Sequence, residues 1–498
     1  MSQNKSSSTD CSFNIPITDI STSDSSDSST SSSYTYSTST PNSQYTTDLH
    51  IPPPPTHKPP PPPPSTVIDI LTNTSPTVST FTPPEENEYG TPYPELHSPQ
   101  LELSAFQQSE SSLSMLQNTT SIPDDDIIPG LPPSIYPAAY TKLLHDMRNK
   151  KVARVLSICG GGIRGIIPST YLEQIENEIH IPIKELFHLI AGTSTGAIIT
   201  CGVNDYPTTE ISKIYLNESS EMFQKRSFFT NPFNLFNSKY KSTPLLNKYK
   251  QYFSDKTLAD LTYDSLITFY DMTSRESRFF KSHRARYTEQ ENYPLWEVLA
   301  CTSAAPTYFK PYTLKYKGSI QGFRYDENYL NTVRGLDPSL QPKTIKAIDG
   351  GVTNNNPTLC AFTEACQLYP NADAIMLLTL GTGSCEKSLD CKSLLSWGIN
   401  IPDICMSGAS GVVNHTIKYL STIYNKSVYH ININLNIPEQ FSTMDNPINV
   451  STLREMALND YGNMSTIRLL SHILNIPITD RNEICIDGLA QNKYIPWG

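Results

Sequence analysis

The sequence predicts an α/β fold, a three-layer sandwich built around a mainly parallel sheet, preceded by a long disordered N-terminal tail. Three observations support this prediction. Between residues 150 and 475, apolar runs of strand length alternate with stretches of helix length, as in chains whose parallel strands are connected through helices. Two of these runs end in glycine-rich turns. The first 130 residues, by contrast, lack the aliphatic content of a folded domain.

The tail is expected to comprise residues 1–130. Residues 1–50 are mostly Ser, Thr, Asn and Asp, and pure proline runs follow at 52–55 and 59–64. Such segments cannot bury enough apolar surface to offset the entropy of ordering them, so we expect disorder with stiff polyproline II tracts. The proline runs are a hypothetical tether for proline-rich-binding partners. An unchanged set of bound proteins after deletion of residues 1–130 would remove that hypothesis.

One globular domain is expected over residues 150–475, followed by a short C-terminal extension, residues 476–498. Strands are predicted at buried apolar runs, and helices where apolar residues recur every three or four positions. The aromatic and Asn-rich stretch 224–245 fits neither pattern. The predicted strands are 152–158, 187–191, 265–272, 344–348, 373–380 and 428–435, the last nearer the sheet edge, and the predicted helices are 137–149, 168–178, 197–201, 210–223, 295–301, 453–461 and 464–474.

Composition narrows the class of partner and the compartment. The net charge of -11 disfavours nucleic acid as a partner, because phosphate binding needs a basic surface. Ten cysteines without a CxxC pair fit free thiols in a reducing compartment. The N-terminus lacks the apolar core of a signal peptide, and no apolar run is long enough for a membrane span. We therefore expect an intracellular, cytoplasmic protein that is soluble or peripheral to membranes.

The sharpest chemical signal is a serine at a predicted strand-to-helix turn. The pentapeptide Gly192-Thr193-Ser194-Thr195-Gly196 follows the apolar run FHLIA and has the GxSxG spacing of a nucleophile elbow. Glycines flank the serine because larger side chains would clash in so tight a turn. The helix that begins at the serine favours negative charge at its N-terminus. We expect Ser194 as the nucleophile and its four neighbours as the elbow.

A glycine-rich loop, GGGIRG, directly follows the first predicted strand. Read as GxGxxG it permits dinucleotide binding, but the acidic residue expected at a second strand end is replaced by glutamates in a predicted helix. Bare backbone N–H groups also suit an oxyanion hole, which we favour over a plain turn. Arg164 is expected to hold the loop to neighbouring carbonyls. The predicted oxyanion-hole residues are Gly160, Gly161, Gly162, Ile163, Arg164 and Gly165.

An aspartate at another strand end is the candidate base. Asp349, with Gly350 and Gly351, follows the run TIKAI. In a parallel sheet the C-terminal strand ends share one edge, where such a residue can reach a serine. In isolation, a DGG sequence is more often a turn in which the aspartate caps a helix. The catalytic interpretation therefore depends on the other two motifs.

Together, GGGxRG, GxSxG about 30 residues later and DGG roughly 150 residues further on resemble the patatin-like phospholipases. Further landmarks, LSI, TSAAPTYF, NNP and LGTG, extend the resemblance over about residues 150–465. It implies hydrolysis of the carboxylic esters of phospholipids or related acyl lipids, of phospholipase A type, through an acyl-enzyme on Ser194. Asp349 would accept the serine proton, and backbone N–H groups around Gly161, Gly162 and Ile163 would bind the oxyanion. The implied partner is a lipid substrate, met transiently at a membrane or micelle surface.

Several alternatives stay open. The family usually has Asp before the glycines, where this chain has Cys159, for which a buried inert thiol is the more frequent case. A carboxylate is a competent base in a water-poor site, because desolvation raises its proton affinity. His415, His430 and His472 nevertheless follow Asp349 and permit a Ser–Asp–His triad. A catalytically weak lipid-binding protein on the same fold is the other rival.

Three weaker signals concern substrate contact and the core. The aromatic residues Phe228, Phe229 and 233–236 are candidates for an apolar lip, and the basic run 281–286 for contact with lipid headgroups, although packed aromatics and a solvated charge run are commoner. His188 is expected in the core. No metal constellation is visible, so we predict no metal, calcium included, and no cofactor.

Overall fold

The computed structural model describes part of the chain in detail. The described residues all belong to one compact unit, Pro62–Gly498. The predicted tail, residues 1–130, lies outside them except for Ile68–Asp69, and the predicted extension 476–498 lies outside them from residue 486 onward. The described ranges are 68–69, 138–225, 238–317, 321–322, 344–385, 393–463 and 465–485.

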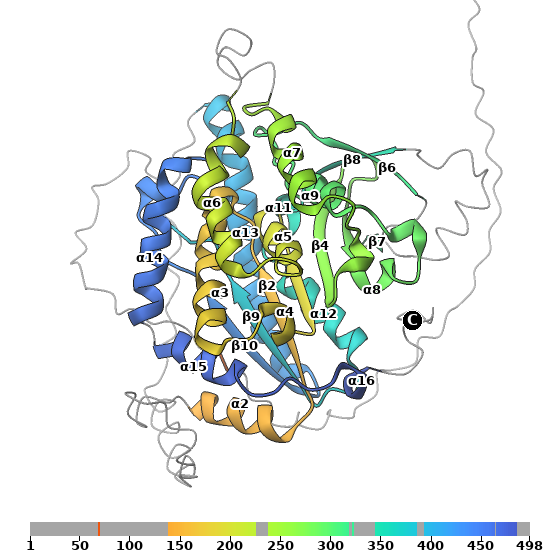
Figure 1. Ribbon diagram of the computed structural model, residues 1–498, viewed down its shortest axis with the longest axis vertical. Coiled ribbons are helices and arrows are strands. Elements are labelled where there is room, and N and C mark those ends of the chain that lie inside the picture. Colours follow the sequence, from red (N-terminus) through yellow and green to blue (C-terminus); the bar gives the residue numbers. More distant parts are fainter. Residues whose placement is uncertain are drawn as a thin grey trace, which may run out of the picture. The chain divides into compact units, whose positions relative to one another are not determined.

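A mixed, mostly parallel sheet lies at the centre of this unit (Figure 1). Its strands follow the order β1-β10-β9-β2-β3-β4-β5-β7, and β8 joins by pairing with β4 and β6. Neighbours from β1 to β4 are parallel, whereas β5 and β8 are both antiparallel to β4. The strands are β1 Ile68–Asp69, β2 Val152–Ile158, β3 Leu189–Gly192, β4 Asp264–Asp271, β5 Glu276–Lys281, β6 Tyr312–Lys315, β7 Gln321–Gly322, β8 Thr344–Asp349, β9 Ala374–Leu380 and β10 Ser427–Ile433.

Helices cover both faces of the sheet and complete the predicted three layers (Figure 1). On one face α2, α3, α5, α6, α7, α9, α14 and α15 contribute to a first core, and on the other α12, α13 and α16 contribute to a second. The main helices are α2 Ala138–Asn149, α3 Ile166–Ile179, α5 Thr195–Gly202, α6 Thr208–Met222, α7 Ser242–Phe253, α8 Ser282–Ala285, α9 Leu295–Thr302, α11 Gly351–Asn354, α12 Thr358–Leu368, α13 Leu394–Ile423, α14 Val450–Asn463, α15 Ser465–Leu474 and α16 Arg481–Ile484.

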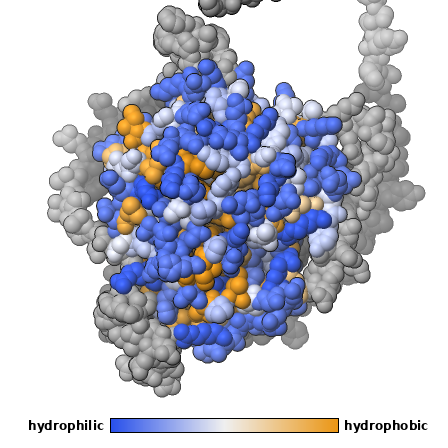
Figure 2. All heavy atoms as spheres, in the orientation of Figure 1, coloured by the Kyte–Doolittle hydropathy of each residue, from blue (hydrophilic) through white to orange (hydrophobic). Residues whose placement is uncertain are grey.

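Strand β2 shows why the sheet is buried on both sides. All seven of its residues are buried, with Leu156 and Ile158 in the first core and Ala153 and Val155 in the second. Successive side chains of a strand point to opposite faces, so an unbroken apolar run is what a central strand between two helical layers requires. Figure 2 shows a face on which hydrophilic side chains predominate and smaller hydrophobic patches lie between them.

Every strand and helix predicted from the sequence is present, with ends shifted by a few residues. Strand β10 lies next to the two-residue β1, which confirms its predicted place near the sheet edge. The longer elements that were not predicted are the helices α7, α12 and α13 and the strands β5 and β6. Within the described residues, none of the helices combines the length and apolar character needed to cross a bilayer.

Candidate active site

Strands β3 and β8 meet end to end beside β4, and this brings Ser194 and Asp349 together. Gly192 ends β3 and pairs with Ile267, while Asp349 ends β8 and pairs with Phe269. The two partners are only two positions apart on β4, about 7 Å along the strand. We expected Asp349 on a parallel strand, and that part is wrong, because β8 is antiparallel to β4. The motifs meet because the two strands point toward each other.

Ser194 occupies a turn that few non-glycine residues adopt. Its backbone has φ 54° and ψ −118°, outside the regions favoured by L-residues, and its neighbour Thr195 begins α5. The Ser194 N–H donates to Thr302 Oγ1 at 2.9 Å, which fixes the turn. Gly196 is required, because a Cβ at that position would lie 2.2 Å from the carbonyl oxygen of Ile158. The sequence GTSTG therefore forms a sharp strand-to-helix elbow.

The remaining elbow positions hold the turn in place. A Cβ at Gly192 would lie 2.5 Å from a backbone oxygen of the same turn. Thr193 Oγ1 donates to a backbone carbonyl of α11 at 2.7 Å. Thr195 Oγ1 is hydrogen-bonded to the Tyr215 hydroxyl of α6, and Gly165 leaves room for that pair, since its Cβ would lie 2.2 Å from the threonine oxygen.

Asp349 accepts a hydrogen bond from Ser194 Oγ at 2.6 Å through its Oδ2 atom. Its Oδ1 atom accepts the Gly351 N–H at 2.7 Å, which orients the carboxyl group. Gly350 is required, because its Cβ would lie 2.1 Å from Thr268 Oγ1. Asp349 is only 4% exposed, and burial raises its pKa to about 6 despite the two hydrogen bonds. A carboxyl group with this pKa can exchange a proton near neutral pH.

Part of the predicted oxyanion hole is engaged elsewhere. The Gly160 N–H donates to Asn355 O at 3.0 Å, and the Ile163 N–H donates to Met444 O at 2.9 Å. The Arg164 N–H donates to a carbonyl within the glycine loop at 3.2 Å. These three backbone N–H groups hold the loop in place and are not available to an oxyanion. The set of candidate oxyanion donors is therefore smaller than the sequence predicts.

Gly161 and Gly162 remain as candidate donors. Both line the same cavity as Ser194, and none of the backbone hydrogen bonds among the described residues is donated by their N–H groups. Gly162 has φ +60°, and a Cβ there would lie 2.1 Å from the carbonyl oxygen of Met444. A Cβ at Gly161 would lie 2.2 Å from Thr382 Oγ1. Glycine is therefore needed at both positions to present two N–H groups beside the serine.

Arg164 and Cys159 support the loop without the features of reacting groups. Arg164 Nη1 donates to the carbonyl oxygen of Ser442 at 3.1 Å, the structural contact expected from the sequence. Cys159 is buried, and burial raises the pKa of its thiol to about 12. A thiol in that state supplies almost no thiolate, the reactive form of cysteine. The backbone N–H of Cys159 donates to Leu380 O at 3.0 Å, which ties the loop to β9.

An apolar cavity of about 820 Å³, partly open to solvent, lies over Ser194 and Asp349. Its inner end is formed by buried side chains of α6 and α7, and its outer end by half-exposed side chains that include Met406 of α13. The lining residues are Gly161, Gly162, Ser194, Thr195, Ile198, Tyr215, Ser219, Met222, Phe223, Leu245, Tyr249, Ser303, Ala305, Pro306, Tyr308, Phe309, Asp349, Val352, Met406 and Met444.

The candidate triad histidines lie elsewhere. His430 is buried with Nε2 2.9 Å from Thr379 Oγ1, His472 is on α15, and His415 is exposed on α13. His188 is buried, as expected for a core residue, and its Nδ1 accepts the Arg154 N–H of β2 at 2.9 Å. Among the described residues, no recorded hydrogen bond joins a histidine to Ser194 or Asp349, and no cluster of three His, Cys, Asp or Glu side chains could hold a metal ion.

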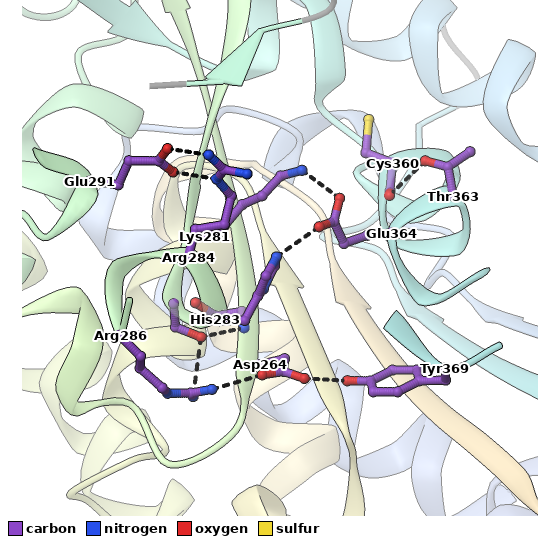
Figure 3. Close-up of polar contacts among 12 residues, drawn as sticks. Asp264, Lys281, His283, Arg284, Arg286, Glu291, Cys360, Thr363, Glu364 and Tyr369 are labelled. Atoms are coloured by element: carbon purple, nitrogen blue, oxygen red, sulfur yellow. Dashed lines mark hydrogen bonds and ion pairs between the residues drawn. The ribbon is translucent and has the colours of Figure 1, made fainter. Parts of the chain in front are cut away.

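The candidate headgroup contact at residues 281–286 is not supported, and the run is not the solvated one that is commoner either. These basic side chains point inward and are paired with acidic residues of the fold, so their charges are already neutralised (Figure 3). The candidate aromatic lip, Phe228, Phe229 and 233–236, lies outside the described residues. The ion pairs are Lys281 with Glu364 at 2.5 Å, Arg284 with Glu291 at 2.6 Å and Arg286 with Asp264 at 2.8 Å.

Comparisons with known proteins support the resemblance inferred from the motifs. Residues 156–362 match the family described as patatin-like phospholipase. Patatin-like protein 2 of Oryza sativa subsp. indica is 27% identical over 284 residues, covering 50% of this chain and 65% of that protein. Patatin-like protein 4 of Arabidopsis thaliana is 27% identical over 262 residues, covering 47% and 60%. The chain thus spans slightly less than two thirds of these relatives.

Two further proteins are similar to parts of this chain. A Solanum tuberosum relative named probable inactive patatin-3-Kuras 1 is 26% identical over 268 residues, covering 50% of this chain and 68% of that protein. The crystal structure of VipD from Legionella pneumophila aligns with a TM-score of 0.28 and 13% identity, covering 61% of this chain and 67% of that one. Because one relative is named inactive, family similarity leaves catalysis to be tested on the site itself.

Proposed function

Because residues 156–362 match the patatin-like phospholipases, we propose that this protein hydrolyses carboxylic ester bonds of phospholipids or related acyl lipids, with phospholipase A-type cleavage through an acyl-enzyme on Ser194. The observation that carries the proposal is the 2.6 Å hydrogen bond from Ser194 Oγ to Asp349 Oδ2 beneath an apolar cavity. A largely apolar cavity with a few convergent polar groups suits the acyl chain of a lipid and its ester.

Acylation begins when Ser194 Oγ attacks the ester carbonyl and Asp349 accepts the hydroxyl proton. The oxygen–carbon bond forms, and negative charge develops on the former carbonyl oxygen. The N–H groups of Gly161 and Gly162 would donate to that oxyanion. The intermediate collapses when the bond to the alkoxide breaks, and Asp349 returns its proton to the leaving oxygen. A lysolipid departs, and the acyl group remains on Ser194.

Deacylation repeats the same steps with water as the nucleophile. Asp349 takes a proton from water as the water oxygen attacks the acyl carbonyl. Asp349 then protonates Ser194 Oγ as the acyl–enzyme bond breaks. The products are a free fatty acid and the regenerated hydroxyl group. One buried carboxyl group thus alternates between base and acid, for which its pKa of about 6 is suited.

The pH dependence of hydrolysis is expected to report the ionisation of Asp349. Because only the carboxylate accepts the serine proton, kcat/KM for a neutral ester should fall about tenfold per pH unit below the pKa of about 6. Initial rates from pH 4 to 8, with circular dichroism at each pH as a control for folding, give this profile. A profile that stays flat down to pH 4 would contradict the assignment of Asp349 as the base.

Fluorophosphonate labelling tests the proposed function directly. The folded protein should be labelled, and mass spectrometry of the digested protein should place the adduct on Ser194. Unlabelled protein from the same preparation would then be assayed for release of fatty acid from phosphatidylcholine vesicles, and pre-labelled protein should release none. Folded protein that neither takes up the probe nor releases fatty acid would support the lipid-binding alternative.

A further inference from the structure

A second cavity of about 400 Å³, partly open to solvent, adjoins the active-site cavity. Ile198, Tyr215, Met222 and Tyr249 line both cavities, so they form the boundary between them. The reaction steps described above use no residue that lines the second cavity alone. Its residues come from α5, α6, α7 and their flanking turns.

Helix α5 leads from the nucleophile to this second cavity. Ser194, Ile198 and Gly202 are spaced four residues apart, so they lie on one face of the helix. At 1.5 Å per residue, Gly202 is about 12 Å from Ser194 along the helix axis. Ser194 lines the first cavity, Ile198 lines both, and Gly202 lines the second. The face of α5 that carries the nucleophile therefore forms a continuous wall along both cavities.

The walls of the second cavity suit an apolar ligand. Ile211, Ile214 and Phe253 contribute aliphatic and aromatic surface. The Tyr206 hydroxyl that lines it donates to a backbone carbonyl at 2.8 Å and needs no ligand partner. Lys248 is paired with two glutamates of α6 at 3.1 and 2.9 Å, so its charge is balanced within the protein. A chain of methylene groups matches such walls better than a charged or hydrogen-bonding group.

Of the four residues at the boundary, the two tyrosines are fixed by hydrogen bonds and Met222 is adaptable. The Tyr215 hydroxyl is hydrogen-bonded to Thr195 Oγ1, and the Tyr249 hydroxyl to Ser303 Oγ at 2.8 Å. Both tyrosine rings are therefore held by residues of the active-site cavity. The Met222 side chain has no hydroxyl group that could fix it in the same way. Methionine is unbranched and readily changes rotamer to fit a neighbouring group. A change of rotamer at Met222 would open a path from the first cavity to the second.

We propose that the second cavity receives the distal part of a long acyl chain whose ester is bound at Ser194, and that Gly202 sets the usable depth. This inference rests on the proposed lipid hydrolysis and adds to it a preference for long acyl chains. Gly202 is suited to that role because it is the residue of the nucleophile helix that faces the second cavity without a side chain. A Cβ there would lie 3.0 Å from Ile211 Cδ1, the flexible end of a side chain.

The test compares kcat/KM for p-nitrophenyl palmitate and p-nitrophenyl butyrate in the full chain. In Gly202→Leu, the added side chain should occupy the second cavity and lower the palmitate-to-butyrate ratio on the order of tenfold or more. The matched control is Gly462→Leu, the same change in α14 at a position whose Cβ has no atom within 4 Å, where the ratio should not change. Ile214→Trp fills the same cavity from α6 and should lower the ratio as well.

The outcomes separate this inference from the proposed function. A lower ratio in Gly202→Leu or Ile214→Trp, but not in Gly462→Leu, supports the second cavity as the distal acyl site. Turnover of both esters with an unchanged ratio in the two cavity-filling variants overturns the inference and leaves the proposed function intact. Failure of the folded wild-type protein to turn over either ester overturns the proposed function, and this inference with it.

Discussion

Ser194→Ala is expected to lower kcat for ester hydrolysis by on the order of 10⁴- to 10⁶-fold, because the acyl-enzyme cannot form without the hydroxyl group. Alanine keeps the Cβ and the backbone that the elbow requires, so folding should be preserved. The measurement is kcat and KM on a chromogenic ester, together with fluorophosphonate labelling of the same preparation. Labelling should disappear in step with turnover.

The control for this variant is Ser407→Ala, which removes an exposed serine hydroxyl of α13 away from the elbow. It should retain wild-type turnover and labelling. If Ser194→Ala kept more than about a hundredth of the wild-type kcat, Ser194 would not be the nucleophile, and another group in the cavity would have to carry the acyl intermediate.

Asp349→Asn is expected to lower kcat/KM by about 10⁴-fold, the scale seen when an aspartate that supports a nucleophile is made neutral. The amide is nearly isosteric with the carboxyl group and can still accept the Gly351 N–H, so the geometry of β8 should survive. It cannot accept a proton from Ser194 Oγ. The residual activity should therefore lose the fall near pH 6 that the wild-type protein is expected to show.

The matched control is Asp373→Asn, which neutralises an exposed aspartate at the opposite end of the sheet, where its carboxylate accepts the Lys151 N–H at 3.0 Å. The profiles of both variants and of the wild-type protein would be measured on one ester between pH 4 and 8. Near-wild-type activity in Asp349→Asn would move the base elsewhere, and the histidine triad would then be tested by substituting His415, His430 and His472 together.

The sequence allowed the site to be predicted because its chemistry is concentrated in short motifs. GTSTG predicts a sharp turn here because the strand before it is apolar enough to be recognised as buried. The direction of β8 could not be predicted in the same way. A run such as TIKAI shows only that a strand exists, whereas its pairing with β4 is decided by β5, β6 and the rest of the sheet. The contact between Ser194 and Asp349 was therefore expected for an incorrect reason.

The same limit explains which oxyanion donors were overestimated. All N–H groups of GGGIRG look alike in the sequence, but Asn355 and Met444, which accept two of them, are distant in the chain. Only the folded arrangement shows which donors are already engaged. Helix α13 could not be predicted from its local sequence. Its 30 residues include Pro402 and several glycines, which ordinarily interrupt helices. Ile417 of this helix packs into the second core, a tertiary contact that the local sequence does not reveal.

The burial of Asp349 also has a consequence for the pH dependence of folding. An aspartate in an unfolded chain titrates near 3.8, whereas in the folded protein the pKa of this group is raised to about 6. Between these values the folded state holds a proton that the unfolded state has released, so folding gains stability from this group at low pH. That contribution is fully present below about pH 3.8 and is lost as the pH rises through about 6. The fold therefore stabilises the protonated carboxyl group of Asp349 over the carboxylate. The carboxylate, however, is the form that the proposed mechanism needs to activate Ser194.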